Sequence, residues 1–422
     1  MNVVSQQQRV VITGIGIVSS LGTGAEEHYE KLRNGQGGGT IKKDWSEPEL
    51  KEEYFFPCPE FNIKESFEGL KAPFPLRYSQ LAMMGCLKAV EDAGLKDLEI
   101  PRDRLGMILN TTFAANAAVE AYLRKLFGQG PRKASPFTFT KTVSNCALGD
   151  ITRYFKFRGP SSILLGENSV CYGLDLLRDD EADIMICGGF DEVRDINVLS
   201  HREAGILSSP GKGTSGSAHE NLIAALRREQ PIGQTILGEG SAFVVLEKRE
   251  HALARGAKIY AEIKDYATVR DEAYVDWVPE RNQGDFSYVM DASMKQAKVS
   301  PADVDCVVGS ASLPWQANEQ EVAAIRAVWQ ESPVSYTMLK PLTGETFGAS
   351  GPMALATAAM MMDRNEIVGT GLPVDLFTEP TAGSSVSISE KTVASAGPLR
   401  NVLVNSLHAG GNTTSIVLGA AA

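Results

Sequence analysis

The side chains that could act as nucleophiles, bases or metal ligands are few and widely spaced in this sequence. The six cysteines are Cys58, Cys86, Cys146, Cys171, Cys187 and Cys306. No two of them form the CxxC pair that zinc sites and redox dithiols use, and most stand in apolar surroundings. This pattern favours reduced, buried thiols in a cytoplasmic protein over a disulfide framework. We expect neither a metal ion nor a cofactor.

A pair of glycines near the start invites comparison with a dinucleotide-binding turn. Gly14 and Gly16 follow an apolar run, but no third glycine stands at the required spacing and no helix begins there. We therefore interpret them as a tight turn after a central strand and expect no nucleotide.

The acidic balance of the chain limits its partners. Among 422 residues, 41 Lys and Arg stand against 52 Asp and Glu, which gives a formal net charge of −11. A nucleic-acid or anionic-membrane binder needs a basic face, so we expect neither partner. No apolar run approaches the roughly 18 residues that span a bilayer, and residues 1–9 are too polar for a signal peptide. These features predict a cytoplasmic protein.

Short apolar runs alternate with helical patterns and would position any site. Strands are predicted at residues 9–22, 107–110, 184–187, 242–246, 261–266, 304–308, 334–337, 402–405 and 414–418. Helices are predicted at residues 25–33, 78–93, 288–297, 319–329 and 354–362, and residues 34–75 resemble a long surface excursion. The alternation predicts an α/β fold with a largely parallel sheet. Because the order of elements restarts near residue 260, we expect two duplicated halves.

Seven segments, in order along nearly the whole chain, resemble the β-ketoacyl synthase family. They are Arg9-Val-Val-Ile-Thr-Gly14, Arg158-Gly-Pro-Ser161, Cys187-Gly-Gly189, Gly238-Glu-Gly240, Glu250-His-Ala-Leu-Ala-Arg-Gly256, Lys340-Pro-Leu-Thr-Gly-Glu-Thr-Phe-Gly-Ala-Ser-Gly351 and Asn405-Ser406…Gly410-Gly411. The resemblance implies a thiolase-like, five-layered αβαβα fold with mixed, largely parallel sheets, normally dimeric. Its halves would be residues 1–258 and 259–422.

The resemblance also implies a condensation between an acyl group and malonyl on acyl carrier protein. That chemistry needs a thiolate at a helix N-terminus and two neutral histidines that donate hydrogen bonds to the thioester carbonyl. Aligned without gaps, the nucleophile position falls on Asn168 and the two histidine positions on Ser310 and Glu345. An amide is no nucleophile, and a carboxylate accepts hydrogen bonds where a donor is needed. All three catalytic side chains are therefore expected to be missing.

Some assignments around these positions stay open. A shifted register would bring Cys171 near the helix start, although we favour a buried thiol on the following helix. Lys340 and Glu321 match a lysine and glutamate of the family, and we expect them to form a buried ion pair. Four histidines are expected to be exposed to solvent: His28, His201, His219 and His251. His408 is expected to have a packing or surface role, with a place in the pocket as the alternative.

This set of losses resembles the chain-length factor, or ketosynthase-β, of type II polyketide synthases. The resemblance implies a silent subunit that pairs with an intact ketosynthase, works with acyl carrier protein and bounds a tunnel for the growing chain. The candidate tunnel residues are Thr112, Phe113, Phe137, Phe139 and Ala409, of which Ala409 replaces a gating phenylalanine. For Phe137 and Phe139, a plain core role is the stronger expectation.

Three alternatives remain. One is a decarboxylating, priming ketosynthase, for which Ser310 and Glu345 are unsuited because that reaction still needs both histidines. Another is a condensing enzyme that uses Cys171 with an unusual base. The third is a scaffold that binds its partner or a carrier protein without setting chain length.

Overall fold

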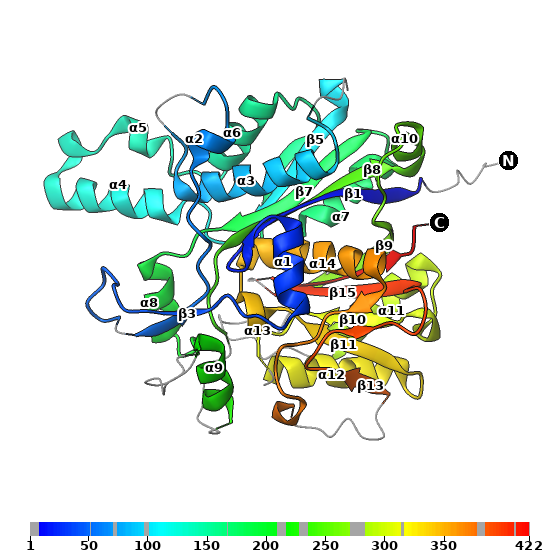
Figure 1. Cartoon of the computed structure of the whole chain (residues 1–422). Helices are drawn as coiled ribbons and strands as arrows, with labels where there is room; N and C mark the ends of the chain where they lie inside the picture. Colours follow the sequence, from blue (N-terminus) through cyan, green and yellow to red (C-terminus); the bar gives the residue numbers. More distant parts are fainter. Residues whose placement is uncertain are drawn as a thin grey trace.

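The computed structural model describes most of the chain (Figure 1). The described residues are 8–50, 52–70, 74–96, 101–166, 168–208, 217–227, 235–270, 283–313, 316–377, 385–408 and 411–421. Ala409, one of the candidate tunnel residues, lies outside them.

The strands form a mixed sheet in which one order of strands occurs twice. The strands of the first half are β1 (Val10–Ser19), β5 (Leu105–Thr111), β6 (Ser161–Leu165), β7 (Ile184–Asp191) and β8 (Gly240–Lys248). Those of the second half are β9 (Ala261–Arg270), β10 (Cys306–Gly309), β11 (Val334–Met338), β13 (Val386–Ile388), β15 (Asn401–Leu407) and β16 (Asn412–Gly419). The first half runs β6-β5-β7-β8-β1 and the second β11-β10-β15-β16-β9, with β13 added at its edge.

The pairing directions repeat as well as the order. In each half the first three strands are parallel and the last two antiparallel. Strands β1 and β9 pair antiparallel and join the two halves. The predicted duplication is therefore present in the topology, although no repeat is visible between individual residues.

Helices form the remaining layers of the fold. They are α1 (Ala25–Arg33), α3 (Arg77–Asp92), α4 (Asn116–Gln129), α5 (Pro136–Phe139), α6 (Cys146–Phe155), α7 (Ser169–Arg178), α8 (Asp195–Glu203), α9 (Ala218–Leu226), α10 (Arg249–Ala254), α11 (Gln283–Ala297), α12 (Gln316–Trp329), α13 (Lys340–Thr343) and α14 (Ser350–Arg364). Figure 1 shows α3 and α6 outside the first half of the sheet, α7 and α14 between its two halves, and α11 and α12 outside the second half. This is the five-layered thiolase-like arrangement.

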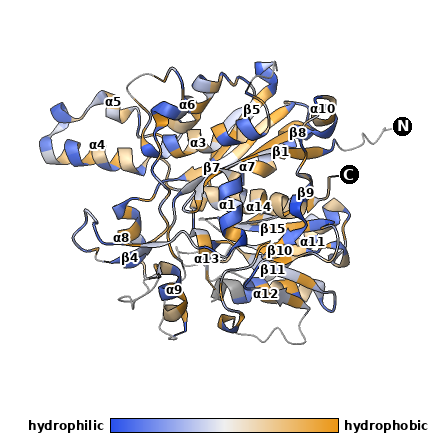
Figure 2. Ribbon diagram, in the orientation of Figure 1, coloured by the Kyte–Doolittle hydropathy of each residue, from blue (hydrophilic) through white to orange (hydrophobic). Residues whose placement is uncertain are grey.

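The central helix α14 explains why the two halves stay together. Its residues from Gly351 to Met362 are all buried, and Figure 2 shows hydrophobic residues along it and along the neighbouring strands. A helix that is apolar on every side must be covered on every side. The helix therefore packs between the two halves of the sheet, against β8 and β15.

The predicted turn at Gly14 and Gly16 is wrong, because both glycines lie inside β1. A Cβ on Gly14 would come within 2.6 Å of the Ala89 carbonyl oxygen, and one on Gly16 within 2.1 Å of the Gly85 carbonyl oxygen. Glycine is needed there because α3 packs directly against the strand backbone.

The predicted surface excursion of residues 34–75 is only partly at the surface. It contains β3 (Thr40–Lys42) paired with β4 (Glu53–Phe55), followed by α2 (Ile63–Ser66). Tyr54, Phe55 and Phe56 are buried.

The described part of the chain has no helix with both the length and the apolar character that crossing a bilayer requires.

Candidate functional site

The N-terminus of α7 carries Asn168 as its N-cap residue. The side-chain oxygen of Asn168 accepts a hydrogen bond from the Val170 amide at 3.0 Å, and its Nδ2 donates to the Ser406 hydroxyl at 3.2 Å. Asparagine is a strongly preferred cap because it satisfies an otherwise unpaired helix amide. At the N-terminus of α7, the Asn168 side chain is therefore bound to the Val170 amide. A nucleophile at this place would need free backbone amides to stabilise an oxyanion.

Replacing Asn168 by alanine is expected to lower the free energy of unfolding by about 1 kcal/mol, the usual cost of losing an N-cap. Aspartate keeps the acceptor and favours the helix dipole, so Asn168→Asp should lose less than Asn168→Ala. Urea denaturation of the three proteins measures the difference. An alanine variant as stable as the wild type would contradict a capping role.

Cys171 lies in the first turn of α7, and its side chain is buried. Burial, together with the nearby Asp175 carboxylate, raises the pKa of the Cys171 thiol well above its usual range. The thiolate is the nucleophilic form, so Cys171 is poorly suited to attack at neutral pH. Asn168 and Cys171 both line a pocket of about 490 Å³.

Ser310 follows β10, at the first of the two predicted histidine positions. Its backbone amide donates to the Glu321 carboxylate at 3.1 Å, and the Ala311 amide does so at 3.3 Å. The Ser310 hydroxyl is buried and has no hydrogen-bond partner among the described residues. A serine hydroxyl is shorter than an imidazole and cannot reach the same point in space.

Glu321 is fully buried and is surrounded by neutral donors. Besides the two amides, it accepts from the Tyr336 hydroxyl at 3.0 Å and from Asn405 Nδ2 at 2.8 Å. Burial raises the pKa of the Glu321 carboxyl even though these hydrogen bonds act to lower it. The predicted ion pair between Lys340 and Glu321 is therefore wrong, because neutral groups satisfy the carboxylate.

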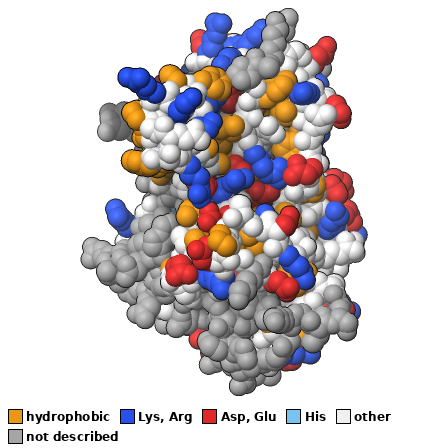
Figure 3. Space-filling view, turned by 90° about the vertical axis from the view of Figure 1, so that its left-hand side faces the viewer, with side chains coloured by type: hydrophobic (Ala, Val, Ile, Leu, Met, Phe, Trp, Pro, Cys, Tyr) orange, Lys and Arg blue, Asp and Glu red, His pale blue; other side chains and the backbone are white. Residues whose placement is uncertain are grey.

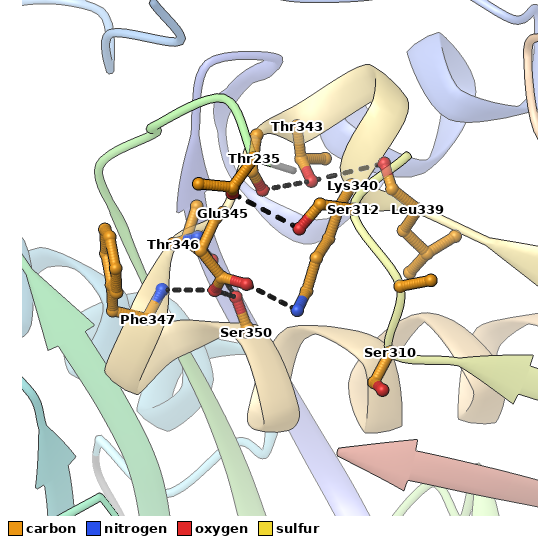
Figure 4. A network of polar contacts seen from close by, with 12 residues as sticks. Thr235, Ser310, Ser312, Leu339, Lys340, Thr343, Glu345, Thr346, Phe347 and Ser350 are labelled. Atoms are coloured by element: carbon orange, nitrogen blue, oxygen red, sulfur yellow. Dashed lines mark hydrogen bonds and ion pairs between the residues drawn. The ribbon is translucent and has the colours of Figure 1, made fainter. Parts of the chain in front are cut away.

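Lys340 instead pairs with Glu345, the residue at the second predicted histidine position. The Lys340 ammonium lies 2.5 Å from Glu345 Oε2, and Oε1 accepts from the Ser350 hydroxyl at 2.6 Å and the Phe347 amide at 2.8 Å (Figure 4). Burial raises the pKa of Glu345, but the charge of Lys340 and these hydrogen bonds outweigh it and leave that pKa below its usual value. Glu345 is thus an ionised acceptor at neutral pH.

The free space beside these side chains is very small. A cavity of about 20 Å³ lies among Ser310, Lys340, Ser350 and Ser406. That is room for roughly one water molecule. A thioester group does not fit this space unless the side chains move.

The loop after β15 brings His408 into the same region. A Cβ placed on Gly351 would lie 3.3 Å from Ser406 Cβ, 3.4 Å from Asn168 Nδ2 and 3.5 Å from His408 Cε1. His408 is buried. Its burial near Gly351 agrees with the expected packing role, and Ser406, which lines the small cavity, is a residue of this region that sequence analysis missed.

Two of the histidines expected at the surface are buried. His28 accepts or donates a hydrogen bond at 2.7 Å with Ser19, and burial lowers its pKa to about 3. His201 is buried against the rings of Phe113 and Phe347, with centroids 5.9 and 5.6 Å away. The burial of neither histidine could be predicted from its neighbours in the sequence.

The described residues contain no cluster of three or more side chains arranged to hold a metal ion.

The candidate tunnel residues fall into two separate groups. Thr112 and Phe113 form the turn after β5, and the Phe113 ring packs 4.4 Å from that of Phe347. Phe137 and Phe139 lie on α5 and are 52% and 57% exposed. The expectation that these two are core residues is wrong, because α5 projects from the body of the molecule (Figure 1).

Known proteins resemble this chain over almost its full length. 3-Oxoacyl-(acyl-carrier-protein) synthase 2 of Staphylococcus aureus (strain COL) is 28% identical over 384 residues, which cover 87% of this chain and 88% of that protein. 3-Oxoacyl-(acyl-carrier-protein) synthase 1 of Haemophilus influenzae is 27% identical and covers 97% of this chain and 98% of its own.

Solved structures show the same fold. The ishigamide ketosynthase/chain length factor superposes with a TM-score of 0.85 at 24% identity, covering 99% of this chain and 100% of that one. The structure of a type II PKS acyl-carrier protein in complex with its ketosynthase contains a chain that superposes with a TM-score of 0.82 at 22% identity. The match covers 99% of this chain and 100% of that one.

The family match covers both halves of the fold. The family described as "Beta-ketoacyl synthase, N-terminal domain" matches residues 7–252, and "Beta-ketoacyl synthase, C-terminal domain" matches residues 260–371. The chain therefore belongs to the β-ketoacyl synthase family.

Proposed function

We propose that this chain is a catalytically silent subunit that pairs with an active ketosynthase and bounds the tunnel of a growing polyketide on acyl carrier protein. The observation that carries the proposal is Asn168, which caps α7 where the family places its nucleophile. An amide that satisfies the helix N-terminus can neither form a thioester nor leave that end open.

The two histidine positions support the same proposal. Condensation and decarboxylation both need donors to the thioester carbonyl, whereas Glu345 is an ionised acceptor bound to Lys340. An anion there would also repel malonyl and a developing enolate. The Ser310 amide donates a hydrogen bond to the Glu321 carboxylate. The cavity beside the Ser310 side chain has a volume of only about 20 Å³. A decarboxylating enzyme is therefore less consistent with this site than a silent subunit.

An exposed sheet edge supports a partner subunit. Among the described residues, β6 pairs with β5 and ends the sheet, and its Leu165 is 63% exposed. An unpaired edge with apolar side chains is a surface for another strand. Phe127, Phe137 and Phe139 are exposed on α4 and α5, which project from the same half of the molecule. A subunit that covers these surfaces would remove an otherwise unfavourable exposure.

A basic stretch of chain supports an acidic carrier protein as a partner. Residues 112–160 hold eight Lys and Arg against two Asp and Glu, a local charge of +6 in a chain of −11. The basic residues are Arg124, Lys125, Arg132, Lys133, Lys141, Arg153, Lys156 and Arg158. Figure 3 shows basic and hydrophobic side chains together on the upper part of the face where α4 and α5 project. Carrier proteins are typically acidic, so such a surface would steer them.

The proposal is tested with the chain alone and in complex with a catalytically intact ketosynthase. Alone, the chain should neither consume malonyl-carrier nor gain an acyl mass on Cys171 by intact mass spectrometry. In the complex, Phe113→Ala should lengthen the products and Thr112→Trp should shorten them, while condensation continues. The control is Phe377→Ala, since Phe113 and Phe377 are both 7% exposed but Phe377 lies in the core of the second half.

Acylation of the isolated chain would overturn the silent-subunit proposal. If both tunnel variants gave the wild-type product distribution, the chain would be a scaffold without a role in chain length.

A further inference from the structure

One buried carboxylate links the candidate tunnel end to the loop that contains Glu345. Asp191 is the last residue of β7 and is fully buried. It accepts hydrogen bonds from the Thr111 hydroxyl at 2.7 Å, from the amides of Thr112, Phe113 and Gly348 at 2.8 Å, and from the Ala114 amide at 3.3 Å. Four of these five donors belong to the turn of residues 111–114. The fifth belongs to the loop that follows Glu345.

Both segments bound by Asp191 contain a strained residue. Ala114 has φ of +50° and Phe347 has φ of +52°, a left-handed conformation that residues other than glycine rarely adopt. Such a conformation persists only where surrounding contacts hold it. The Asp191 hydrogen bonds to Ala114 itself and to Gly348, the neighbour of Phe347, are contacts of this kind.

The two segments also touch each other through their backbones. A Cβ on Gly348 would lie 2.6 Å from Thr111 Cα and 2.7 Å from the Asn110 carbonyl oxygen. The Phe113 and Phe347 rings also pack against each other, with their centroids 4.4 Å apart. Asp191 thus binds the backbone of Phe113 and that of Gly348, the neighbour of Phe347.

We propose that Asp191 is a positioning residue for the tunnel end, because its ionised carboxylate holds the 111–114 turn, and with it Thr112 and Phe113, against Gly348. The inference rests on the proposed function, since it assumes that Thr112 and Phe113 limit chain length. Product length should then depend on the charge of Asp191.

The environment of Asp191 makes that charge sensitive to pH. Burial raises the pKa of Asp191 to about 6, although the hydrogen bonds from Thr111, Gly348, Thr112 and Phe113 act to lower it. Protonation places a hydrogen on an oxygen at which N–H or O–H donors already point, so at least one of these bonds must open.

Other titratable groups surround these segments. They are His201 on α8, the Lys340–Glu345 pair behind Phe347, and Glu192 with Arg194 after β7. The first test is therefore made on Asp191 directly.

Hydrogen exchange of the isolated full chain tests whether Asp191 holds the 111–114 turn, and it requires no assumption about function. The protection factors of the amides of residues 112–114 and 348 should fall about tenfold between pH 7.5 and pH 5.5, as expected for one lost hydrogen bond to a charged group. Asp191→Asn should show the low protection at both pH values. Glu321→Gln, which changes a buried carboxylate elsewhere, should keep the wild-type pH dependence at these amides. Protection that is unchanged by pH in the wild type would overturn the proposal, whether or not Asp191→Asn folds.

Product length in the complex with the active ketosynthase gives the second readout. The wild type should shift its product distribution between pH 7.5 and pH 6, and Asp191→Asn should give the shifted distribution at both. If Phe113→Ala changes product length but Asp191→Asn and pH do not, the positioning role fails and the proposed function stands. If Phe113→Ala also has no effect, the proposed function fails, and the exchange experiment still decides whether Asp191 holds the turn.

Discussion

Replacing Lys340 by methionine is expected to lower the free energy of unfolding by about 3 kcal/mol at pH 7. The side chains of Lys340 and Glu345 are only 11% and 15% exposed. Removing the ammonium therefore leaves an ionised carboxylate that is largely cut off from water. Ser350 and Phe347 still donate to it, but neither supplies a positive charge. Urea denaturation at pH 7 measures the loss.

The double variant Lys340→Met/Glu345→Gln serves as the control, because it removes both charges and should recover most of the lost stability. The deficit of Lys340→Met should also depend on pH. The folded-state pKa of Glu345 lies below its unfolded value. The stability from its charged form is therefore present above about pH 4.3 and is lost as the pH falls through the folded pKa. A deficit that stays constant down to pH 3 would contradict the ion pair as its source.

Replacing Glu321 by leucine is expected to cost at least about 3 kcal/mol of unfolding free energy, since four buried donors would lose their acceptor at once. These donors are the amides of Ser310 and Ala311, the Tyr336 hydroxyl and Asn405 Nδ2. Leucine fills a similar volume but accepts no hydrogen bond. Thermal and urea denaturation should both show the loss.

Glu321→Gln is the matched control, because an amide oxygen still accepts two of the four bonds and carries no charge to bury. Its loss of stability should be clearly smaller than that of the leucine variant. The wild type should lose stability as the pH rises from about 4.3 through the raised folded pKa of Glu321, and the glutamine variant should lack that component. Equal losses in the two variants would mean that volume, and not hydrogen bonding, decides the stability at this position.

The order of the elements could be predicted from the sequence because it depends on local patterns. Apolar runs such as residues 184–187 and 402–405 appear as buried strands, and the restart near residue 260 appears as the second copy of one strand order. The prediction that Asn168 stands at the nucleophile position also came from the sequence, since it depends on a short stretch of chain after Gly159. The structure adds that Asn168 occupies the helix N-terminus as a cap.

Predictions about contacts between distant residues were less accurate. Glu321 was expected to pair with Lys340, but folding places it among neutral donors from three other segments. His28 and His201 were expected in solvent, but tertiary packing buries both. Phe137 and Phe139 were expected in the core, but α5 carries them away from it. In each case the sequence gives the hydrophobicity and charge of the residue itself, but it does not show which segment packs against that residue in the folded protein.

By itself, the sequence determined the family and the duplicated order of strands, and it predicted the three positions, Asn168, Ser310 and Glu345, at which we propose that catalytic side chains are replaced. Each of these depends on residues that are close together along the chain. Only the tertiary structure decided that Lys340 faces Glu345, that Asn168 and His408 both lie near Gly351, and that Asp191 joins the turn of residues 111–114 to Gly348. Hydrogen bonds and ion pairs form only between groups about 3 Å apart. Which groups come that close depends on how folding brings distant segments together, and the separation of two residues along the sequence does not reveal it.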